Sequence, residues 1–386
     1  MTPSVVEPGG MLAILGGGQL GRMTAMAART MGYRVRVMDP EARCPASFVV
    51  DEVVVGRWDD ADAARRLATG ADAVTLEIEQ IGVDALEQVA ALAPLRPGVE
   101  PVRIIQDKIL QKTWLAEHGF PVGAFRIAHS AHELGEAVQS LGGRVFVKTA
   151  RGGYDGRGQA RLGFDHPANE PEISDAWQLL GARPVVVEQS LDLDFEISVM
   201  AARSPSGQVL SYPAARNHHE QQILAWSILP ADIAPALEAT AERLAREIST
   251  ALAIEGLVCV ELFLTRDGRL LVNELAPRPH NSYHQSERAC ATSQFEQLVR
   301  CACNLPLGST ELIVPAAIVN LLGDVWIDAG GHPDFARALE VPTVRLHLYE
   351  KQEARAGRKM GHLSATGATA DEALARVLEA MHRLKP

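Results

Sequence analysis

The sequence of 386 residues predicts a protein of mixed α/β and α+β class, with a doubly wound parallel sheet at its N-terminus and a small β-rich region at its C-terminus. Three observations support this prediction. An apolar run, a glycine-rich turn and a helical pattern open the chain; short apolar runs then alternate with helical segments; and strand pairs joined by tight turns follow. Since the chain is longer than one typical core, we expect two or three domains.

The N-terminal elements alternate between strand and helix, which is the pattern of a parallel sheet. We expect a strand at 11–15, a glycine turn at 16–21, a helix at 22–30, and strands at 34–38 and 73–76 that end at Asp39-Pro40 and Glu77-Ile78-Glu79. The rhythm breaks near residues 95–98, and we place a domain boundary there.

The later elements are mostly helices flanked by hairpins. We expect a polar helix at 102–118, hairpins around Gly153, strands at 185–189 and 195–201, a helix at 235–252, strands at 257–265 and 269–274, hairpin strands within 343–364, and an amphipathic helix at 371–384.

Composition excludes several classes of protein. The formal net charge of −11 argues against nucleic-acid binding, although a local basic loop can still attract a small anion. The five cysteines are scattered without the spacing of a zinc site, so we expect free thiols. With no leader-like N-terminus and no apolar run long enough for a bilayer, we expect a cytoplasmic protein.

A loop at residues 148–159 carries four glycines and several basic residues directly after an apolar strand. Glycines allow several backbone N–H groups to point at one anion, while Lys148 and Arg157 can neutralise its charge. We interpret the segment as a phosphate-binding loop. A glycine-rich hairpin with a solvated tip is the alternative.

The N-terminal glycine turn matches the dinucleotide fingerprint through Gly16, Gly18 and Gly21, with Asp39 near the position of a ribose-binding acid. Alone it would suggest NAD. Glycines at a helix N-terminus bind any phosphate, however, and a merely structural tight turn is also possible.

Two acidic residues, Glu261 and Glu274, lie on the strands that flank the turn at 266–268. Antiparallel pairing can bring both carboxylates to one side of the sheet, where burying them without a cation would cost several kcal/mol. Two carboxylates plus substrate phosphates are typical ligands of Mg²⁺. The alternative is a structural ion pair.

Two further polar segments are candidate anion sites. In the loop after Glu274, Arg278, His280 and Asn281 can together hold a planar oxyanion. The basic segment at 349–359 can hold a terminal phosphate, although a solvated basic turn explains it nearly as well.

Taken together, these residues resemble the ATP-grasp superfamily, and within it the 5-(carboxyamino)imidazole ribonucleotide synthases of purine biosynthesis. The matching segments run in order along the chain: 14–23, 152–159, 187–189, Glu196, Glu261, 273–282, 293–296 and 357–362. The resemblance implies three domains: a Rossmann-like substrate-binding domain at 1–100, an ATP-grasp small subdomain with the glycine-rich lid at 101–192, and a large subdomain with a C-terminal substrate-binding hairpin at 193–386.

The resemblance also implies an ATP site with Mg²⁺ on Glu261 and Glu274. The implied nucleotide contacts are Lys108, Lys148, Gly153, Tyr154, Asp155, Gly156, Arg157, Gly158, Gln159, Glu188, Gln189, Ser190, Leu191, Glu196, His219, Asn273 and Glu274.

The implied reaction is the carboxylation of 5-aminoimidazole ribonucleotide by ATP and bicarbonate through carboxyphosphate, in a cytoplasmic homodimer. The implied ribonucleotide contacts are Gln19, Leu20, Glu77, Tyr154, Asp155, Arg278, Lys351 and Arg358; the implied catalytic residues are Arg278, His280, Asn281 and Asp155. Bicarbonate is expected beside Arg278, His280 and Asn281.

Three positions depart from the family pattern. Ala276 stands where many ATP-grasp enzymes place a metal-ligating Asn, so the two glutamates have to suffice. Tyr283 and Gln222 replace glycines, and we expect both to add bulk beside the cleft.

Three other functions remain open at this stage. The glycine turn with Asp39 would suit an NAD-dependent oxidoreductase, which leaves the paired glutamates and the lid without a role. A ligase of the same superfamily that uses another acid, such as formate, differs in the acid it accepts. A non-catalytic nucleotide sensor would not need every expected charged position to be filled.

Overall fold

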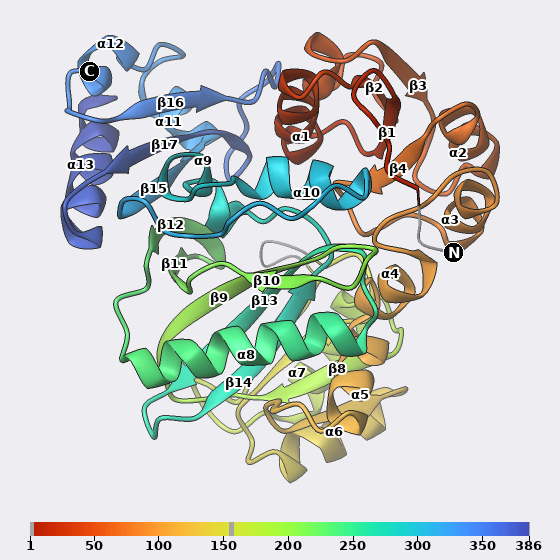
Figure 1. Ribbon diagram of the computed structural model, residues 1–386. Coiled ribbons are helices and arrows are strands. Elements are labelled where there is room, and N and C mark those ends of the chain that lie inside the picture. Colours follow the sequence, from red (N-terminus) through yellow and green to blue (C-terminus); the bar gives the residue numbers. More distant parts are fainter. Residues whose placement is uncertain (1–3, 154–157, 386) are drawn as a thin grey trace.

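Three β-sheets carry the fold of the computed structural model, which describes residues 4–153 and 158–385. Figure 1 shows the N-terminal region at the upper right, the C-terminal region at the upper left and the intervening segments below both. Within the described ranges, no helix combines the length and the apolar composition that a membrane span requires.

The N-terminal sheet is parallel, with strand order β3-β2-β1-β4. Its elements are β1 (Met11–Leu15), α1 (Gln19–Thr30), β2 (Arg34–Asp39), η1 (Pro45–Phe48), β3 (Glu52–Val55), α2 (Ala61–Ala68), β4 (Ala73–Leu76) and α3 (Val83–Ala90). Helix α1 begins at Gln19 rather than at Arg22 as predicted, because Gly18 in extended conformation already serves as its N-cap. The carboxyl ends of the parallel strands meet at one edge, which brings the glycine turn, Asp39 and Glu77 together.

The polar helix predicted at 102–118 is in fact two helices, α4 (Val99–Ile105) and α5 (Lys108–Glu117). The Asp107 side chain accepts hydrogen bonds from the backbone of Ile109 at 3.0 Å and Leu110 at 3.2 Å, so it caps a new helix. Lys108 consequently stands at the first position of α5.

The second sheet is antiparallel, with order β5-β8-β6-β7. Its elements are β5 (Phe125–Ala128), α6 (Ala131–Ser140), β6 (Val145–Thr149), β7 (Gln159–Leu162), α7 (Glu170–Leu179) and β8 (Val185–Gln189). Strands β6 and β7 form the predicted hairpin on either side of the glycine-rich loop.

The third sheet has the order β14-β13-β9-β11-β12-β15-β17-β16, with β10 paired to β9. Its strands are β9 (Leu193–Arg203), β10 (Val209–Ser211), β11 (Ala215–Glu220), β12 (Ile223–Leu229), β13 (Gly256–Thr265), β14 (Leu270–Ala276), β15 (Ala316–Leu322), β16 (Arg345–Leu348) and β17 (Lys359–Thr366). The helices that accompany them are α8 (Pro235–Ala251), η2 (Asn281–Tyr283), α9 (Ser286–Ala289), α10 (Gln294–Ala302), α11 (Gly323–Asp328), α12 (Phe335–Leu339) and α13 (Ala370–Arg383).

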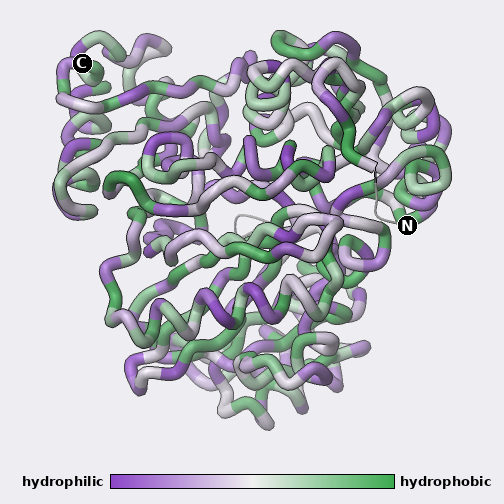
Figure 2. The backbone as a smooth tube through the Cα atoms, in the orientation of Figure 1, coloured by the Kyte–Doolittle hydropathy of each residue, from purple (hydrophilic) through white to green (hydrophobic). Residues whose placement is uncertain are grey.

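Helix α8 covers one face of this sheet because its buried residues Ala241, Leu244, Ala245 and Ile248 recur at helical spacing. Figure 2 shows the corresponding alternation of hydrophilic and hydrophobic segments along α8. The predicted fold class is confirmed. The domain boundaries stay predictions, and the third sheet runs without a break from β14 to the C-terminal hairpin.

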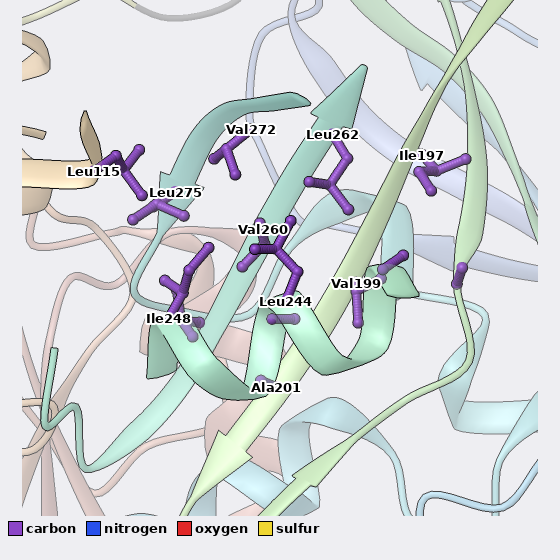
Figure 3. Close-up of a cluster of buried hydrophobic side chains, with 14 of the residues drawn as sticks. Leu115, Ile197, Val199, Ala201, Leu244, Ile248, Val260, Leu262, Val272 and Leu275 are labelled. Carbon is purple, nitrogen blue, oxygen red and sulfur yellow. The ribbon is translucent and has the colours of Figure 1, made fainter. Parts of the chain in front are cut away.

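The core under α8 also fixes the position of helix α5. Leu115 of α5 belongs to the same buried cluster as Val272 and Leu275 of β14 and lies beside them in Figure 3. The side chain of Gln111 reinforces this packing, since its Oε1 accepts a hydrogen bond from the Leu275 backbone at 3.1 Å. The polar face of α5 is thereby held next to Glu274.

Candidate active site

The N-terminal glycine turn is filled by carboxylates of the chain itself. Gly18 and Gly21 donate backbone hydrogen bonds to the two oxygens of Glu77, at 3.0 and 2.9 Å, and Gly17 donates to Asp39 at 3.0 Å. A Cβ at Gly21 would overlap the carbonyl oxygen of Gly16, so this close approach requires glycine. A dinucleotide pyrophosphate would have to displace these carboxylates, and the reading of the turn as an NAD site is therefore wrong.

Burial raises the pKa of both Glu77 and Asp39, although the glycine N–H groups act in the opposite direction. Asp39 also accepts a hydrogen bond from the Glu41 backbone at 2.9 Å, so its role is to hold the turn rather than a ribose. Glu77, an expected ribonucleotide contact, lies at the centre of the turn.

The two glutamates expected to bind metal lie opposite each other on neighbouring strands, Glu261 on β13 and Glu274 on β14. A β-bulge follows, because Leu262 pairs with Val272 and leaves Asn273 as an extra residue. The Asn273 side chain donates to Glu261 at 3.4 Å, so all three side chains reach the same site. The strands on either side of the turn at 266–268 thus pair in antiparallel fashion as expected, and the bulge shifts the register so that Glu261 lies opposite Glu274.

Each of these glutamates is paired with a cation from another segment. Glu274 forms an ion pair with Lys108, and Glu261 lies 3.0 Å from Nε2 of His280. Burial opposes the charge on Glu261, yet its hydrogen bond to His280 prevails and lowers its pKa to about 2. Two ionised oxygens on one face fit the preference of Mg²⁺ for carboxylates.

Lys148, expected to contact phosphate, is held by Glu188 of β8 at 2.5 Å. Burial lowers the pKa of Lys148, but Glu188, Glu274 and Glu261 together raise it above its usual value. The lysine therefore lies within the field of all three carboxylates, between the second and third sheets.

The remaining expected nucleotide contacts line the same region or its rim. Glu196 of β9 pairs with His219 of β11, with Nδ1 and Oε2 3.0 Å apart. The backbone N–H groups of Gln189 and Ser190 are engaged by Ala124 and Arg144, while Leu191 is half-buried after β8.

The glycine-rich loop is described only at its two ends. Gly153 is half-buried, and the carbonyl of Gly158 accepts a hydrogen bond from Thr149 at 2.8 Å. Gln159 pairs with Lys148 in the β6–β7 ladder. Tyr154, Asp155, Gly156 and Arg157 lie outside the described residues, and their expected roles stay predictions.

The loop after β14 carries the three expected anion-binding residues, and one of them, His280, contacts the glutamate pair. Arg278 is half-buried and forms a bidentate ion pair with Glu79, including a contact of 3.1 Å between Nη2 and Oε1. Burial disfavours the charge on His280, but Cys259 and Glu261 raise its pKa to about 10. Neither polar atom of the buried Asn281 amide has a hydrogen-bond partner among the described residues. Such an amide, beside two cations, is suited to an anionic ligand.

Tyr283 does not crowd this cleft, contrary to expectation. Its ring is fully buried against Tyr212, and its hydroxyl hydrogen-bonds the carbonyls of Ser198 and Pro213, both at 2.8 Å. The Tyr283 ring therefore packs in the hydrophobic core behind the loop. Gln222 is exposed at the tip of the β11–β12 hairpin, where its φ of 67° explains why glycine would suit the position.

The C-terminal hairpin reaches the start of helix α1, next to which its loop lies in Figure 1. Lys351 donates hydrogen bonds to Gln19 at 2.6 Å and to the backbone of Lys359 at 2.7 Å. Arg358 donates to the backbone of Glu353 at 3.0 Å. Leu20, an expected substrate contact, packs its side chain into a buried cluster with Tyr349, so only its backbone at the helix start faces the turn.

Sequence reasoning missed three buried residues that complete the site. Glu79 orients Arg278, and Cys259 lies beside His280. Lys112 contacts Glu188 at 2.8 Å. Its four-residue spacing from Lys108 on one helix was the available signal, whereas Glu79 and Cys259 gave none.

Comparisons with known proteins agree with this geometry. Family models match residues 10–106 as a ribonucleotide synthetase preATP-grasp domain, 113–295 as an ATP-grasp domain, and 316–376 as a phosphoribosylaminoimidazole carboxylase C-terminal domain. The chain is 39% identical to the N5-carboxyaminoimidazole ribonucleotide synthase of Bacillus subtilis, covering 96% of this chain and 95% of that protein. Identity to the Brucella melitensis enzyme of the same name is 40%, covering 94% of this chain and 98% of that one.

Solved structures show the same likeness. An N5-carboxyaminoimidazole ribonucleotide synthetase in complex with ADP superimposes with a TM-score of 0.90 at 37% identity, covering 98% of both chains. The Aspergillus clavatus enzyme in complex with ADP and 5-aminoimidazole ribonucleotide gives a TM-score of 0.86 at 31% identity, covering 97% of this chain and 98% of that one.

Proposed function

The chain belongs to the N5-carboxyaminoimidazole ribonucleotide synthases of the ATP-grasp superfamily, and from this premise we propose that it carboxylates the exocyclic amine of 5-aminoimidazole ribonucleotide, using ATP and bicarbonate. It is an ATP-dependent ligase of purine biosynthesis. The geometric observation that carries the proposal is the contact between His280 and Glu261, which joins the anion-binding loop to the glutamate pair in one site.

In the proposed reaction, a bicarbonate oxygen attacks the γ-phosphoryl group of ATP and releases ADP. The resulting carboxyphosphate breaks down to phosphate and CO₂, and the amine of the ribonucleotide attacks CO₂ and loses a proton. Phosphoryl transfer of this kind depends chiefly on alignment and charge neutralisation. The protein therefore acts mainly by positioning.

Each part of the site has a place in this reaction. Glu261 and Glu274 would hold Mg²⁺, which supplies charge neutralisation at the phosphates. Arg278, His280 and Asn281 would hold bicarbonate and stabilise the negative charge of carboxyphosphate, since two of them are half-buried cations and the third is a buried amide without a partner in the described chain.

The ribonucleotide would lie between the N-terminal turn and the C-terminal hairpin. Gln19 and Lys351 already join these two segments, and Lys351 and Arg358 supply positive charge for a phosphate. Glu77 would face the aminoimidazole from the glycine turn. We also propose a homodimer in the cytoplasm; the second point is supported by five cysteines that are all free and buried.

One assay tests the function directly. We expect ADP release to require added 5-aminoimidazole ribonucleotide and bicarbonate together, and to fall to background when either is omitted. Formate in place of bicarbonate serves as the control for a ligase that uses another acid. ADP release with formate, or at an equal rate in carbonate-free buffer, would contradict the proposal.

A further inference from the structure

One buried carboxylate, Glu188, is neutralised by two lysines rather than one. Lys148 of β6 lies 2.5 Å from one of its oxygens and Lys112 of α5 lies 2.8 Å from the other. The side chains are only 13%, 15% and 7% exposed for Glu188, Lys148 and Lys112. The cluster thus carries one cation more than charge balance requires.

Lys112 also donates a long hydrogen bond of 3.4 Å to the Val272 carbonyl of β14, but helix α5 does not depend on this contact for its position. The helix is already anchored through Leu115 in the core and through Gln111, which bonds the Leu275 backbone. Burying an ammonium group is costly, and burial is the main reason why the pKa of Lys112 is lowered. A second cation at this position therefore suggests a role in ligand binding.

Within this cluster, Lys148 interacts both with Glu188 and with the glutamate pair. Its charge interacts with Glu188 and also with Glu274 and Glu261, next to which the nucleotide phosphates are proposed to bind. If Lys148 shares its charge with a phosphate, Glu188 must keep another counter-charge, because an uncompensated buried carboxylate is strongly unfavourable.

We propose that Lys112 is a positioning residue that keeps Glu188 neutralised, so that Lys148 is free to contact the phosphates of the bound nucleotide. This inference rests on the proposed ATP site and adds a residue to it. Lys112 acts through Glu188 and Lys148, and it makes no contact with the nucleotide.

The proposal has a consequence that depends on the ligand. Without Lys112, Lys148 is the one counter-ion left to Glu188 among the residues that the structure describes, and drawing Lys148 towards a phosphate becomes unfavourable. Only ligands that carry phosphates meet this penalty; adenosine does not. Neighbouring charged groups are energetically coupled, so we expect the affinity for a ligand with phosphates to fall about tenfold, equal to ~1.4 kcal/mol.

The test compares Lys112→Met with Lys112→Arg and with the exposed control Lys385→Met. MgADP affinity is measured by calorimetry, and adenosine affinity by competition. We expect Lys112→Met to weaken MgADP about tenfold and to leave adenosine within twofold, with the other two variants close to wild type. Equal losses for both ligands, or no loss for MgADP, would overturn the proposal.

A second substitution separates charge balance from simple damage to the fold. Introducing Glu188→Gln into Lys112→Met removes the carboxylate that retains Lys148, so the ratio of MgADP to adenosine affinity should return to at least half of the wild-type ratio. A ratio that stays tenfold low would contradict the mechanism. Should Lys112→Met fail to fold in a thermal melt, Lys112→Gln is assayed with the same two ligands.

These measurements do not depend on the carboxylation reaction. Failure of the proposed function would instead appear as the absence of ribonucleotide-dependent ADP release by the unaltered chain. The two failures are therefore distinguishable.

Discussion

Two regions of this molecule place carboxylates near glycine-rich turns, and the charges of these carboxylates are compensated in different ways. In the N-terminal turn, Glu77 and Asp39 are held by backbone N–H groups of Gly17, Gly18 and Gly21. In the nucleotide region, Glu188, Glu261 and Glu274 are held by side chains, namely two lysines, a histidine and a further lysine.

This difference between backbone and side-chain partners determines how each region can respond to a ligand. Backbone donors are fixed by the fold, so the N-terminal turn is a rigid frame whose anion site is filled by the protein. Lysine side chains rotate, so the carboxylates of the nucleotide region can exchange a lysine for Mg²⁺ and the lysine can turn to a phosphate. A glycine-rich sequence pattern alone does not distinguish the two cases.

The largest effect on activity is expected at the glutamate pair, where the proposed mechanism requires Mg²⁺ to replace a lysine. Glu274→Gln removes one charge from the glutamate pair, and a bound metal supplies several kcal/mol to a phosphoryl transition state. We expect ADP release to fall by about 10³-fold, with a thermal midpoint close to wild type. The control is Glu247→Gln, an exposed partner of Arg243. Near-native ADP release in Glu274→Gln would show that the metal assignment is wrong.

A smaller loss is expected in the anion-binding loop. Arg278→Met removes a half-buried cation that we propose to hold bicarbonate, and loss of one such group typically reduces turnover by roughly 10²-fold. Steady-state kinetics with varied bicarbonate measures the effect. Arg103→Met, which breaks an exposed pair with Glu100, is the matched control. If both variants turned over equally well, Arg278 would serve only to join the loop to Glu79.

The pH dependence of stability separates Glu261, whose pKa is lowered, from the groups whose pKa is raised. The pKa of Glu261, lowered to about 2, adds stability above its ordinary value of 4.5 that is lost as the pH falls towards 2. The pKa of His280, raised to about 10, adds stability that is complete below 6.5 and lost as the pH rises towards 10. Glu77 and Asp39, whose pKa values burial raises, instead favour the folded state as the pH falls.

Urea unfolding at pH 6.5 and 8.5 checks this sign. We expect the free energy of unfolding of the unaltered protein to fall by about 2 kcal/mol between these values, and His280→Gln to remove most of that fall. His132→Gln, at an exposed histidine, should keep it. An identical pH slope in all three proteins would contradict the assignment of a charged His280.

The smallest effect is expected from the rigid turn. Gly21→Ala places a Cβ against the Gly16 carbonyl oxygen and should lower stability by about 1–2 kcal/mol. Because we propose that the turn frames the ribonucleotide and not ATP, the KM for 5-aminoimidazole ribonucleotide should rise while MgADP affinity stays within about twofold. An equal loss of both affinities would mean that the two regions are coupled rather than separate.

Local sequence signals were sufficient for much of the fold and part of the site. The tight turn at 266–268 predicted the antiparallel pairing of the two strands, but the β-bulge at Asn273 was needed to place Glu261 opposite Glu274. The order of the motifs along the chain was sufficient to predict the family. Helix boundaries that depend on side-chain caps were harder to predict from the sequence. Asp107 divides one expected helix in two through a hydrogen bond that residue periodicity does not reveal.

The sequence by itself determined the alternation of strands and helices, the glycine turns and the residue types of the site, because these follow from short-range periodicity and backbone preference. Only the tertiary structure decided that Glu77 fills the N-terminal turn, that Asn273 is the extra residue of a bulge, and that Lys112 shares Glu188 with Lys148. Glu79 and Arg278, 199 residues apart, meet for the same reason. Charges distant in sequence are brought together by packing, and burial then makes their pairing obligatory.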